Sequence, residues 1–300
     1  MYAPSMNLKL IDLLMTDVIV TGANGFIGRA LCDRLKKDGF DVFELSHEDG
    51  DITNFSVWDR LPRAQAIVHL AALTYVPDSW KSPTEFITKN VVGTQMALEW
   101  CKRSKARMVF ASAYVYGIPH SLPICESNPA KPNNPYALSK FLGEQCCEFA
   151  SHFFGIDTTA LRLFNVYGLG QSEEFLIPTI IKQISGNEIC LKDITPRRDY
   201  VYLLDVVEAF VRALNIALSG FHKINIGSGK SYSVAEVADT LQAILGRKLP
   251  LRSSAEIRQQ EIPDIKADIS LSEQLLGWMP SYDLSSGFHD MLVKGGYLEI

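Results

Sequence analysis

The sequence predicts an α/β protein in which a doubly wound parallel sheet is followed by a smaller C-terminal lobe. From Asp17 onward, short runs rich in β-branched residues alternate with longer segments whose apolar residues recur every three or four positions. This alternation is typical of parallel strands that are covered by helices on both faces. After Gly168 the predicted elements become shorter and less regular, which indicates the second lobe.

The elements can be placed in order along the chain. Strands are expected at residues 18–21, 42–45, 66–70, 108–111 and 158–163, with helices between them at 26–37, 83–102 and 136–154. Later helices are expected at 177–185, 205–218 and 234–245. We therefore expect an irregular extension (1–14), a sheet domain (15–168) whose core can include later strands, and a smaller lobe (169–300). Ligands of such sheets lie beyond the carboxyl ends of the strands, so the site is expected between the two parts.

Composition excludes several classes of function. The 300 residues carry a formal charge of −5, whereas a general nucleic-acid or anionic-membrane binder normally has a basic excess. The sequence shows no apolar run near the roughly 20 residues that cross a bilayer and no signal-peptide pattern. The six cysteines include no CxxC pair, so we expect reduced thiols, no metal site and a cytoplasmic location.

A glycine pattern directly follows the first expected strand. Residues 22–28 read GANGFIG and open the helix that is expected to end near Lys37. Gly22 permits a tight turn, Gly25 lets backbone amides approach a pyrophosphate, and Gly28 allows close packing of helix on strand. The order of strand, glycine loop and helix predicts a Rossmann-type dinucleotide site that also includes Asn24, Phe26 and Ile27.

The sequence does not decide between NAD and NADP. An acid at the end of the second strand usually accepts the adenosine ribose hydroxyls and selects NAD, but Ser46 occupies this place. Further along, Asp51 and Ile52 are predicted to contact and flank the adenine. An ordinary turn role for Asp51 is the alternative.

A catalytic pair is predicted at the start of the helix at 136–154. Tyr136 and Lys140 are four residues apart and therefore share one helix face. A free tyrosine has a pKa of about 10, so a neighbouring ammonium and a positive nicotinamide are needed to favour the phenolate. Ser112 ends a buried strand at the edge where the reactive ring of the cofactor is expected, although a serine there can also be a simple turn former.

Together these motifs resemble the extended branch of the short-chain dehydrogenase/reductase family, specifically its nucleotide-sugar epimerases, dehydratases and reductases. Further segments support the resemblance: HLAA at 69–72, NVVGT at 90–94 and VYG at 115–117. The resemblance implies that Leu70, Ala71 and Ala72 line the cofactor channel and that Asn90 braces the central helices. It also implies a homodimer that pairs the helices at 83–102 and 136–154, and a context of cell-surface polysaccharide supply.

The second lobe carries the predicted substrate residues. Arginines bind the adjacent negative charges of a nucleoside diphosphate through their planar guanidinium groups, so Arg198 and Arg258 are the expected phosphate ligands. Either arginine could instead be a member of a surface ion pair. The resemblance implies that Asn165 contacts the diphosphate, that Glu261 approaches the ribose and that Leu176 borders the nucleobase.

The residues after Ser112 narrow the reaction. Sugar 4,6-dehydratases resembling this chain place an Asp-Glu pair there, whereas this sequence has Ala113 and Tyr114. The sequence therefore favours a C4 epimerase in which Tyr136 exchanges the proton while hydride passes to the nicotinamide and back. A 4-keto-sugar nucleotide reductase that consumes NADPH or NADH is the alternative. A protein that binds the dinucleotide without catalysis is a third reading.

Overall fold

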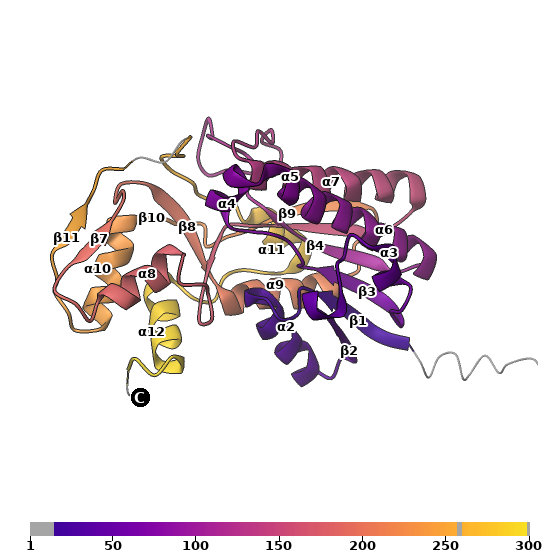
Figure 1. Cartoon of the computed structure of the whole chain (residues 1–300), viewed down its shortest axis with the longest axis horizontal. Helices are drawn as coiled ribbons and strands as arrows, with labels where there is room; N and C mark the ends of the chain where they lie inside the picture. Colours follow the sequence, from indigo (N-terminus) through magenta and orange to yellow (C-terminus); the bar gives the residue numbers. More distant parts are fainter. Residues whose placement is uncertain (1–14, 257–259, 299–300) are drawn as a thin grey trace, which may run out of the picture.

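The computed structural model describes residues 15–256 and 260–298, which form a larger and a smaller lobe (Figure 1). The larger lobe is built on a six-stranded sheet in the order β2-β1-β3-β4-β5-β9. All five neighbouring pairs are parallel, which confirms the predicted doubly wound sheet. Its strands are β1 (Met15–Thr21), β2 (Val42–Leu45), β3 (Arg63–His69), β4 (Arg107–Ala113), β5 (Thr158–Leu163) and β9 (Phe221–Ile226).

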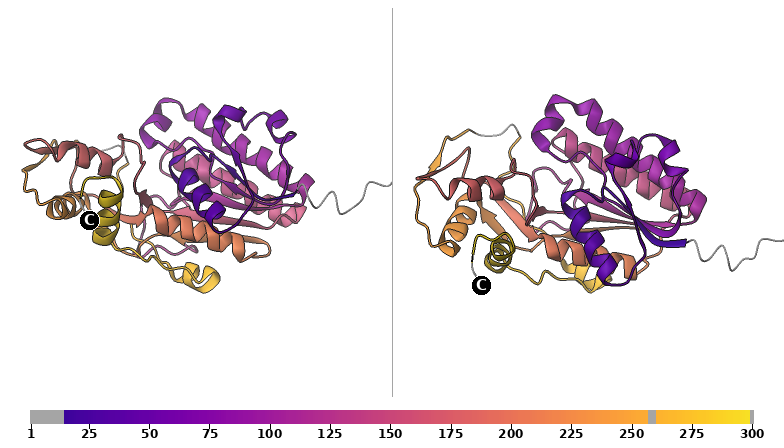
Figure 2. Two further views of the ribbon diagram at one scale, coloured as in Figure 1. Left: turned by 90° about the horizontal axis from the view of Figure 1, so that it is seen from below. Right: turned by 60° about the horizontal axis from the view of Figure 1, so that its bottom comes forward.

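Alternate residues of each strand supply two separate cores. Val18 and Val20 pack on the face covered by α2 (Phe26–Lys37) and α9 (Leu203–Asn215). Ile19 points to the opposite face, which is covered by α6 (Gly93–Ser104) and α7 (Pro135–Phe154). Burial on both faces explains why the strands are almost continuously apolar. Figure 2 shows the helices on both sides of the sheet.

The helix expected at 83–102 is interrupted. It consists of α5 (Pro83–Ile87), a π-helical turn η2 (Thr88–Val92) and α6. π-Bulges of this kind occur frequently at functional sites. The turn contains the buried Asn90, whose side chain bonds backbone and side-chain groups outside the helix.

The smaller lobe contains two small sheets and three helices. One sheet has the order β10-β8-β6 and the other pairs β11 with β7. The elements are β6 (Asn165–Tyr167), α8 (Leu176–Gln183), β7 (Ile189–Leu191), β8 (Arg197–Tyr202), β10 (Ser231–Ser233), α10 (Val234–Ile244), β11 (Leu251–Ser253) and α12 (Leu284–Lys294). Four further short elements lie in the larger lobe: η1 (His47–Asp49), α3 (Phe55–Trp58), α4 (Val76–Lys81) and α11 (Ser270–Leu276).

The two lobes exchange chain segments. After β8 the chain returns to the larger lobe as α9 and β9, leaves it again as β10, and later adds α11 against α9 and β9. The described residues between 169 and 298 therefore contribute to both lobes. The predicted extension at 1–14 lies outside the described residues.

Trp278 links α9 to the segment between α11 and α12. Its side chain is fully buried, and its indole Nε1 donates a 2.9 Å hydrogen bond to the carbonyl oxygen of Asp205. The Asp205 carboxylate in turn accepts hydrogen bonds from the backbone N–H groups of Ser281 and Tyr282. This segment is thus fixed against α9 by a buried polar contact.

We expect Trp278→Phe to lower the free energy of unfolding by about 2–4 kcal/mol, because it leaves a cavity and an unpaired carbonyl. Denaturant unfolding of both proteins measures the change. Trp80→Phe is the matched control, since Trp80 is 44% exposed and its replacement should change little. If both variants lost the same free energy of unfolding, the stabilising role of the Trp278 hydrogen bond and packing would be contradicted.

Candidate active site

The predicted cofactor segments meet at the carboxyl edge of the sheet. Gly22 follows β1, and Leu70 and Ala71 follow the neighbouring strand β3. The N–H of Leu70 donates to the carbonyl oxygen of Thr21, and the N–H of Ala71 donates to the Thr21 hydroxyl. Leu70, Ala71 and Ala72 are half-buried and lie beside the glycine loop. This is the position where the chain reverses direction across the sheet and where such folds bind ligands.

The glycine loop fits a dinucleotide for steric reasons. Gly22 has a φ of +70°, and a Cβ there would lie 2.9 Å from the Ala71 nitrogen. A Cβ on Gly28 would lie 2.2 Å from the Gly22 carbonyl oxygen. Gly25 is the N-cap of α2, so the first N–H groups of this helix, which begins with Phe26, have no partner within it. These backbone groups can hold a pyrophosphate.

Asp49, in the short helix η1 that follows β2, is an acid that was not predicted from the sequence. Ser46 is nearly buried and caps η1, where its hydroxyl donates a 3.0 Å hydrogen bond to the carboxylate of Asp49. The Ser46 backbone N–H also donates to this carboxylate, at 2.8 Å. A negative charge therefore lies beside Ser46, although it comes from three residues further along the chain. The capping pattern SHED at 46–49 was the available signal.

Asp51 and Ile52 make protein contacts in addition to those predicted for the adenine. The Asp51 carboxylate accepts hydrogen bonds from Thr53 and forms an ion pair with Lys89. The Lys89 hydrogen bond is the largest of the effects that lower the pKa of Asp51 to about 2. Ile52 is half-buried and packs against Gly93 of α6. Asp51 thus has the turn role that was the alternative, and its contact with adenine stays a prediction.

Asn90 connects three parts of the larger lobe. Its side-chain Oδ1 accepts from the N–H of Leu73 at 2.8 Å, and its Nδ2 donates to the Leu73 carbonyl and to the Ser139 hydroxyl. The Ser139 hydroxyl donates to the carbonyl oxygen of Tyr136. Asn90 therefore connects the loop after β3 to the start of α7.

Tyr136 and Lys140 lie on the first turns of α7. Asn134 caps this helix through a 2.8 Å hydrogen bond from the Ala137 N–H, and Pro135 is the first helical residue. Lys140 is buried, with its Nζ 4.6 Å from the centre of the Phe110 ring. Burial lowers the pKa of Lys140 to about 8.

Tyr136 needs more than its neighbours to ionise. Burial raises the pKa of Tyr136 above its ordinary value, and the neighbouring phenol of Tyr114 raises it further. The protein alone therefore holds Tyr136 as a neutral phenol. The help that Lys140 is expected to give to this ionisation stays a prediction.

Ser112 lies at the end of β4 and points toward α7. Its Oγ donates a 2.5 Å hydrogen bond to Oε1 of Glu144, which is four residues after Lys140 on the same helix. Arg162 binds both carboxylate oxygens of Glu144, at 2.9 and 2.6 Å. All three side chains are almost completely buried. Sequence reasoning missed Glu144 and the partnership with Arg162.

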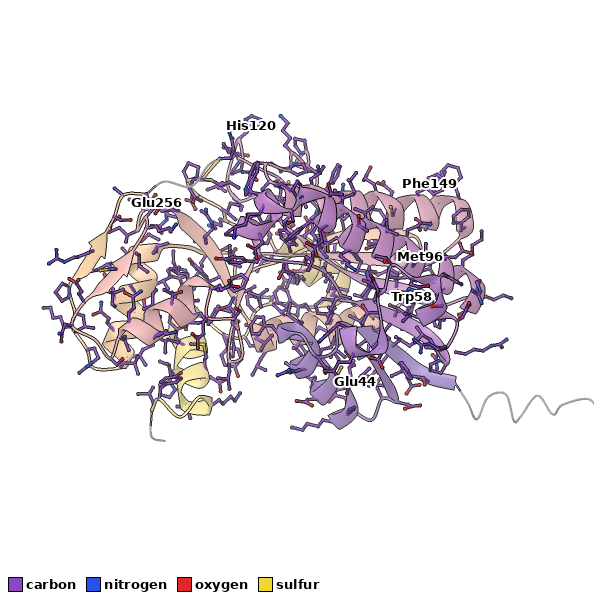
Figure 3. The ribbon with its side chains drawn as sticks, in the orientation of Figure 1. Glu44, Trp58, Met96, His120, Phe149 and Glu256 are labelled. Atoms are coloured by element: carbon purple, nitrogen blue, oxygen red, sulfur yellow. The ribbon has the colours of Figure 1, made fainter. Side chains whose placement is uncertain are left out.

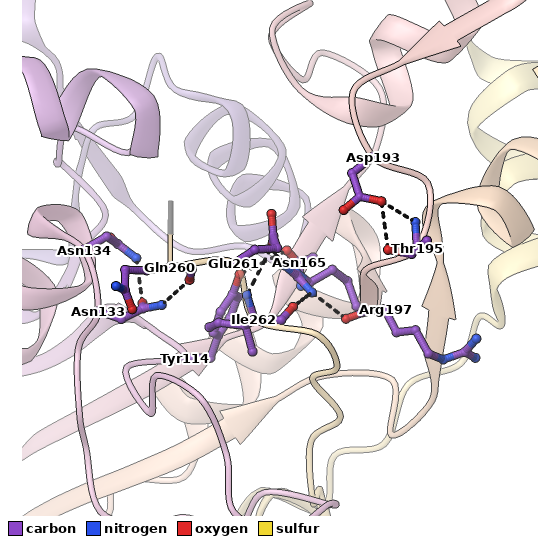
Figure 4. Close-up of polar contacts among 11 residues, drawn as sticks. Tyr114, Asn133, Asn134, Asn165, Asp193, Thr195, Arg197, Gln260, Glu261 and Ile262 are labelled. Carbon is purple, nitrogen blue, oxygen red and sulfur yellow. Dashed lines mark hydrogen bonds and ion pairs between the residues drawn. The ribbon is translucent and has the colours of Figure 1, made fainter. Parts of the chain in front are cut away.

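Three predicted substrate residues, Arg198, Asn165 and Glu261, lie close together, and Figure 4 shows Asn165 and Glu261 near Tyr114. Arg198 of β8 forms an ion pair with Glu261, so each is the other's partner in this structure. Asn165 accepts a 3.4 Å hydrogen bond from the Tyr114 hydroxyl and donates to the carbonyl oxygen of Asp199. Tyr114 thus contacts Asn165, and it also raises the pKa of Tyr136.

The remaining two predicted substrate residues are Leu176 and Arg258. Leu176 is the first residue of α8, half-buried, and follows Phe175, whose ring contacts that of Tyr75 at 5.7 Å between centroids. Arg258 lies outside the described residues.

Between residues 15 and 298, apart from 257–259, the structure shows no cluster of His, Cys, Asp and Glu that could hold a metal ion. In the same part of the chain, no helix is long and apolar enough to span a membrane.

The sequence profile of the NAD dependent epimerase/dehydratase family matches residues 18–227. A protein named putative UDP-glucose 4-epimerase from Methanocaldococcus jannaschii is 32% identical over 298 residues, which cover 90% of this chain and 95% of that protein.

Solved structures give the same result. A UDP-glucose 4-epimerase from Thermotoga maritima, solved with UDP-glucose, is 26% identical with a TM-score of 0.85, and the match covers 92% of this chain and 97% of that one. A UDP-glucuronic acid 4-epimerase variant from Bacillus cereus, solved with NAD and a fluorinated UDP-sugar, is 28% identical with the same score and coverage. The fold and the sequence thus agree, and the chain belongs to the NAD dependent epimerase/dehydratase family.

Proposed function

We propose that this protein is an NAD-dependent nucleotide-sugar C4 epimerase that acts on a UDP-sugar. The observation that carries the proposal is the placement of Tyr136 and Lys140 on α7 beside the end of β4, where Ser112 is followed by Ala113 and Tyr114 rather than by an acid pair. Elimination of water would need an acid and a base at that place. Similarity to proteins named UDP-glucose 4-epimerase supports the same reaction.

The roles of the protein groups follow from their surroundings. When bound, NAD supplies the site that accepts hydride from carbon four and returns it. Tyr136 exchanges the proton of the 4-hydroxyl, and Ser112 contacts the same oxygen. Lys140 supplies a positive charge that favours the phenolate of Tyr136 once the cofactor is in place. Gly22, Asn24, Gly25, Phe26, Ile27 and Gly28 would hold the pyrophosphate.

The Asp49 carboxylate favours NAD over NADP. It lies beside Ser46 at the end of β2, where the adenosine ribose is expected. A carboxylate accepts hydrogen bonds from ribose hydroxyls and repels a 2′-phosphate. This carboxylate supports the epimerase over a reductase that consumes NADPH.

Arg198 retains donors for the substrate diphosphate. Its Nη1 donates to the carbonyl oxygens of Arg197 and Ile262, and its Nη2 donates to Glu261. A guanidinium has five N–H groups, so two of them have no partner among the described residues. Glu261 keeps this cation in place, and its approach to a ribose stays a prediction.

We further propose that the smaller lobe binds the nucleotide portion of the substrate.

We also propose that the protein is cytoplasmic. The six cysteines are free thiols in the structure, and Cys101 and Cys147 are buried. Reduced thiols are typical of a reducing compartment.

Tyr136→Phe should reduce the interconversion of UDP-galactose and UDP-glucose by at least about 100-fold, because it removes the group that exchanges the proton. Bound NAD, identified by mass after denaturation, should remain. Tyr297→Phe is the control, since Tyr297 is 56% exposed near the end of the described chain. Unchanged turnover in Tyr136→Phe would overturn the mechanism, and stoichiometric consumption of reduced dinucleotide would indicate a reductase.

The activity should also report the charge of Lys140. Burial lowers its pKa to about 8, so Lys140 is charged below this pH and loses its proton as the pH rises through it. We expect kcat/KM for UDP-galactose to fall up to tenfold per pH unit above about 8. A profile that stays flat to pH 9.5 would argue against this role of Lys140.

We propose that the protein forms a homodimer through α6 and α7. Leu138, Phe149 and Phe153 lie along one face of α7 and are 42%, 54% and 64% exposed. Figure 3 shows Phe149 at the outer side of α7 and Met96 on the neighbouring α6. An exposed apolar stripe of this kind is typical of a protein interface.

Light scattering should give about twice the chain mass of 33.4 kDa for the wild type. Replacing Phe149 and Phe153 together by Glu should give the monomer, because two charges would be buried without partners. Met279→Glu, at a residue that is 54% exposed after α11, should leave the mass unchanged. A wild-type monomer at working concentration would exclude the dimer.

A further inference from the structure

Tyr114 is a polar side chain at the candidate active site to which the proposed function gives no role. It is the first residue after β4 and follows Ser112 by two positions. Side chains two residues apart along an extended chain leave it on the same side, so Tyr114 continues the row that Ser112 begins, beyond the carboxyl edge of the sheet. Tyr114 is half-buried, so part of its side chain is open to a ligand.

The ring of Tyr114 is held by packing, whereas its hydroxyl is only weakly bonded. The ring contacts that of Phe164 at 5.5 Å between centroids and packs on the buried apolar cluster that also contains Ile262. The hydroxyl donates to Oδ1 of Asn165 at 3.4 Å, which is longer than the roughly 2.7–2.8 Å of a good O–H···O hydrogen bond. Within the described part of the chain, this is the only side-chain hydrogen bond of Tyr114.

Asn165 is bonded just as loosely. Its Nδ2 donates to the carbonyl oxygen of Asp199 at 3.3 Å. A phenol can donate one hydrogen bond and also accept, and a side-chain amide can donate two and accept two. Both side chains therefore keep hydrogen-bonding capacity that a ligand with better geometry can use.

Tyr114 is close to the residues proposed for both ends of the sugar. Asn165 is the proposed contact of the diphosphate, which is attached to carbon one. Tyr136 is proposed to act at carbon four, and the nearby phenol of Tyr114 contributes to the raised pKa of Tyr136. We therefore expect a pyranose that is held at carbon one and at carbon four to lie beside the Tyr114 hydroxyl.

We propose that Tyr114 is a sugar-binding residue: its hydroxyl leaves Asn165 and forms a hydrogen bond with a hydroxyl group of the sugar (Figure 4). This inference rests on the proposed function. The exchange also frees Oδ1 of Asn165 and lets its amide turn toward the diphosphate.

A phenol suits a reaction that inverts carbon four. Inversion requires the sugar to present first one face and then the other to the same catalytic residues. When carbon one and carbon four keep their places, this turn brings the two opposite edges of the ring past Tyr114 in succession. A hydroxyl that both donates and accepts can bind either edge. Both UDP-glucose and UDP-galactose should therefore depend on Tyr114.

Titration calorimetry on the NAD-loaded protein tests the proposal. The measurements use the Tyr136→Phe background, in which the two UDP-sugars should not interconvert during the titration. Tyr114→Phe removes only the hydroxyl and should raise the Kd of UDP-galactose and of UDP-glucose about 10-fold, the usual loss for one hydrogen bond. UDP has no sugar, so its Kd should change less than about 2-fold.

Tyr116→Phe is the matched control, because it removes a hydroxyl from the same segment. The Tyr116 hydroxyl is buried and donates to Asn225 at 2.6 Å. Its loss should lower the free energy of unfolding but leave the ratio of the Kd values for UDP-galactose and UDP unchanged. Circular dichroism and the NAD content confirm that each titrated variant is folded.

The outcomes separate the inference from the proposed function. If Tyr114→Phe weakens UDP and UDP-galactose by the same factor, or weakens neither, Tyr114 does not bind the sugar and the inference is overturned. If the protein that retains Tyr114 binds no UDP-sugar, the proposed function fails and the inference falls with it. A loss confined to the UDP-sugars supports the inference.

Discussion

The close packing of α7 on β4 and β5 determines where the candidate catalytic groups lie. Gly143 makes this approach possible, since a Cβ there would lie 2.8 Å from the ring of Phe110. One residue later, Glu144 forms the buried ion pair with Arg162 that ties the helix to β5. The helix is thus fixed by one steric and one electrostatic contact on the same turn. Tyr136 and Lys140 lie two turns and one turn earlier, so their position follows from this packing.

The buried ion pair between Glu144 and Arg162 serves mainly to position side chains, and it contributes less to stability. Taking two charges out of water costs much of the energy that their attraction returns, so an apolar pair could serve stability equally well. An apolar pair could not accept the hydrogen of Ser112. A carboxylate between a serine and an arginine gives the serine hydroxyl one defined orientation.

The proposed diphosphate ligand is anionic, although the protein is acidic. The chain has a net charge of −5, so individual cations such as Arg198 are the proposed ligands of the diphosphate. Arg198 is held on three sides by protein acceptors, among them Glu261, and is therefore oriented before the ligand arrives. Orientation in advance lowers the entropy lost on binding.

Because α9 and β9 return to the larger lobe, the two lobes are also joined by several chain crossings.

The sequence by itself determined the features that are local along the chain. The glycine loop at 22–28 and the pair Tyr136 and Lys140 depend on spacings of three or four residues, and the alternation of strand and helix patterns predicted the parallel sheet. Only the tertiary structure decided that Glu144 binds both Ser112 and Arg162, that Arg198 pairs with Glu261, and which later segments join the large sheet. These contacts join residues 18 to 63 positions apart, and strand order together with side-chain direction, rather than spacing, brings such residues together. Asp49 combines both kinds of contact. Its capping hydrogen bond with Ser46 is local, but its place near the carboxyl edge of the large sheet depends on the pairing of β2 with β1.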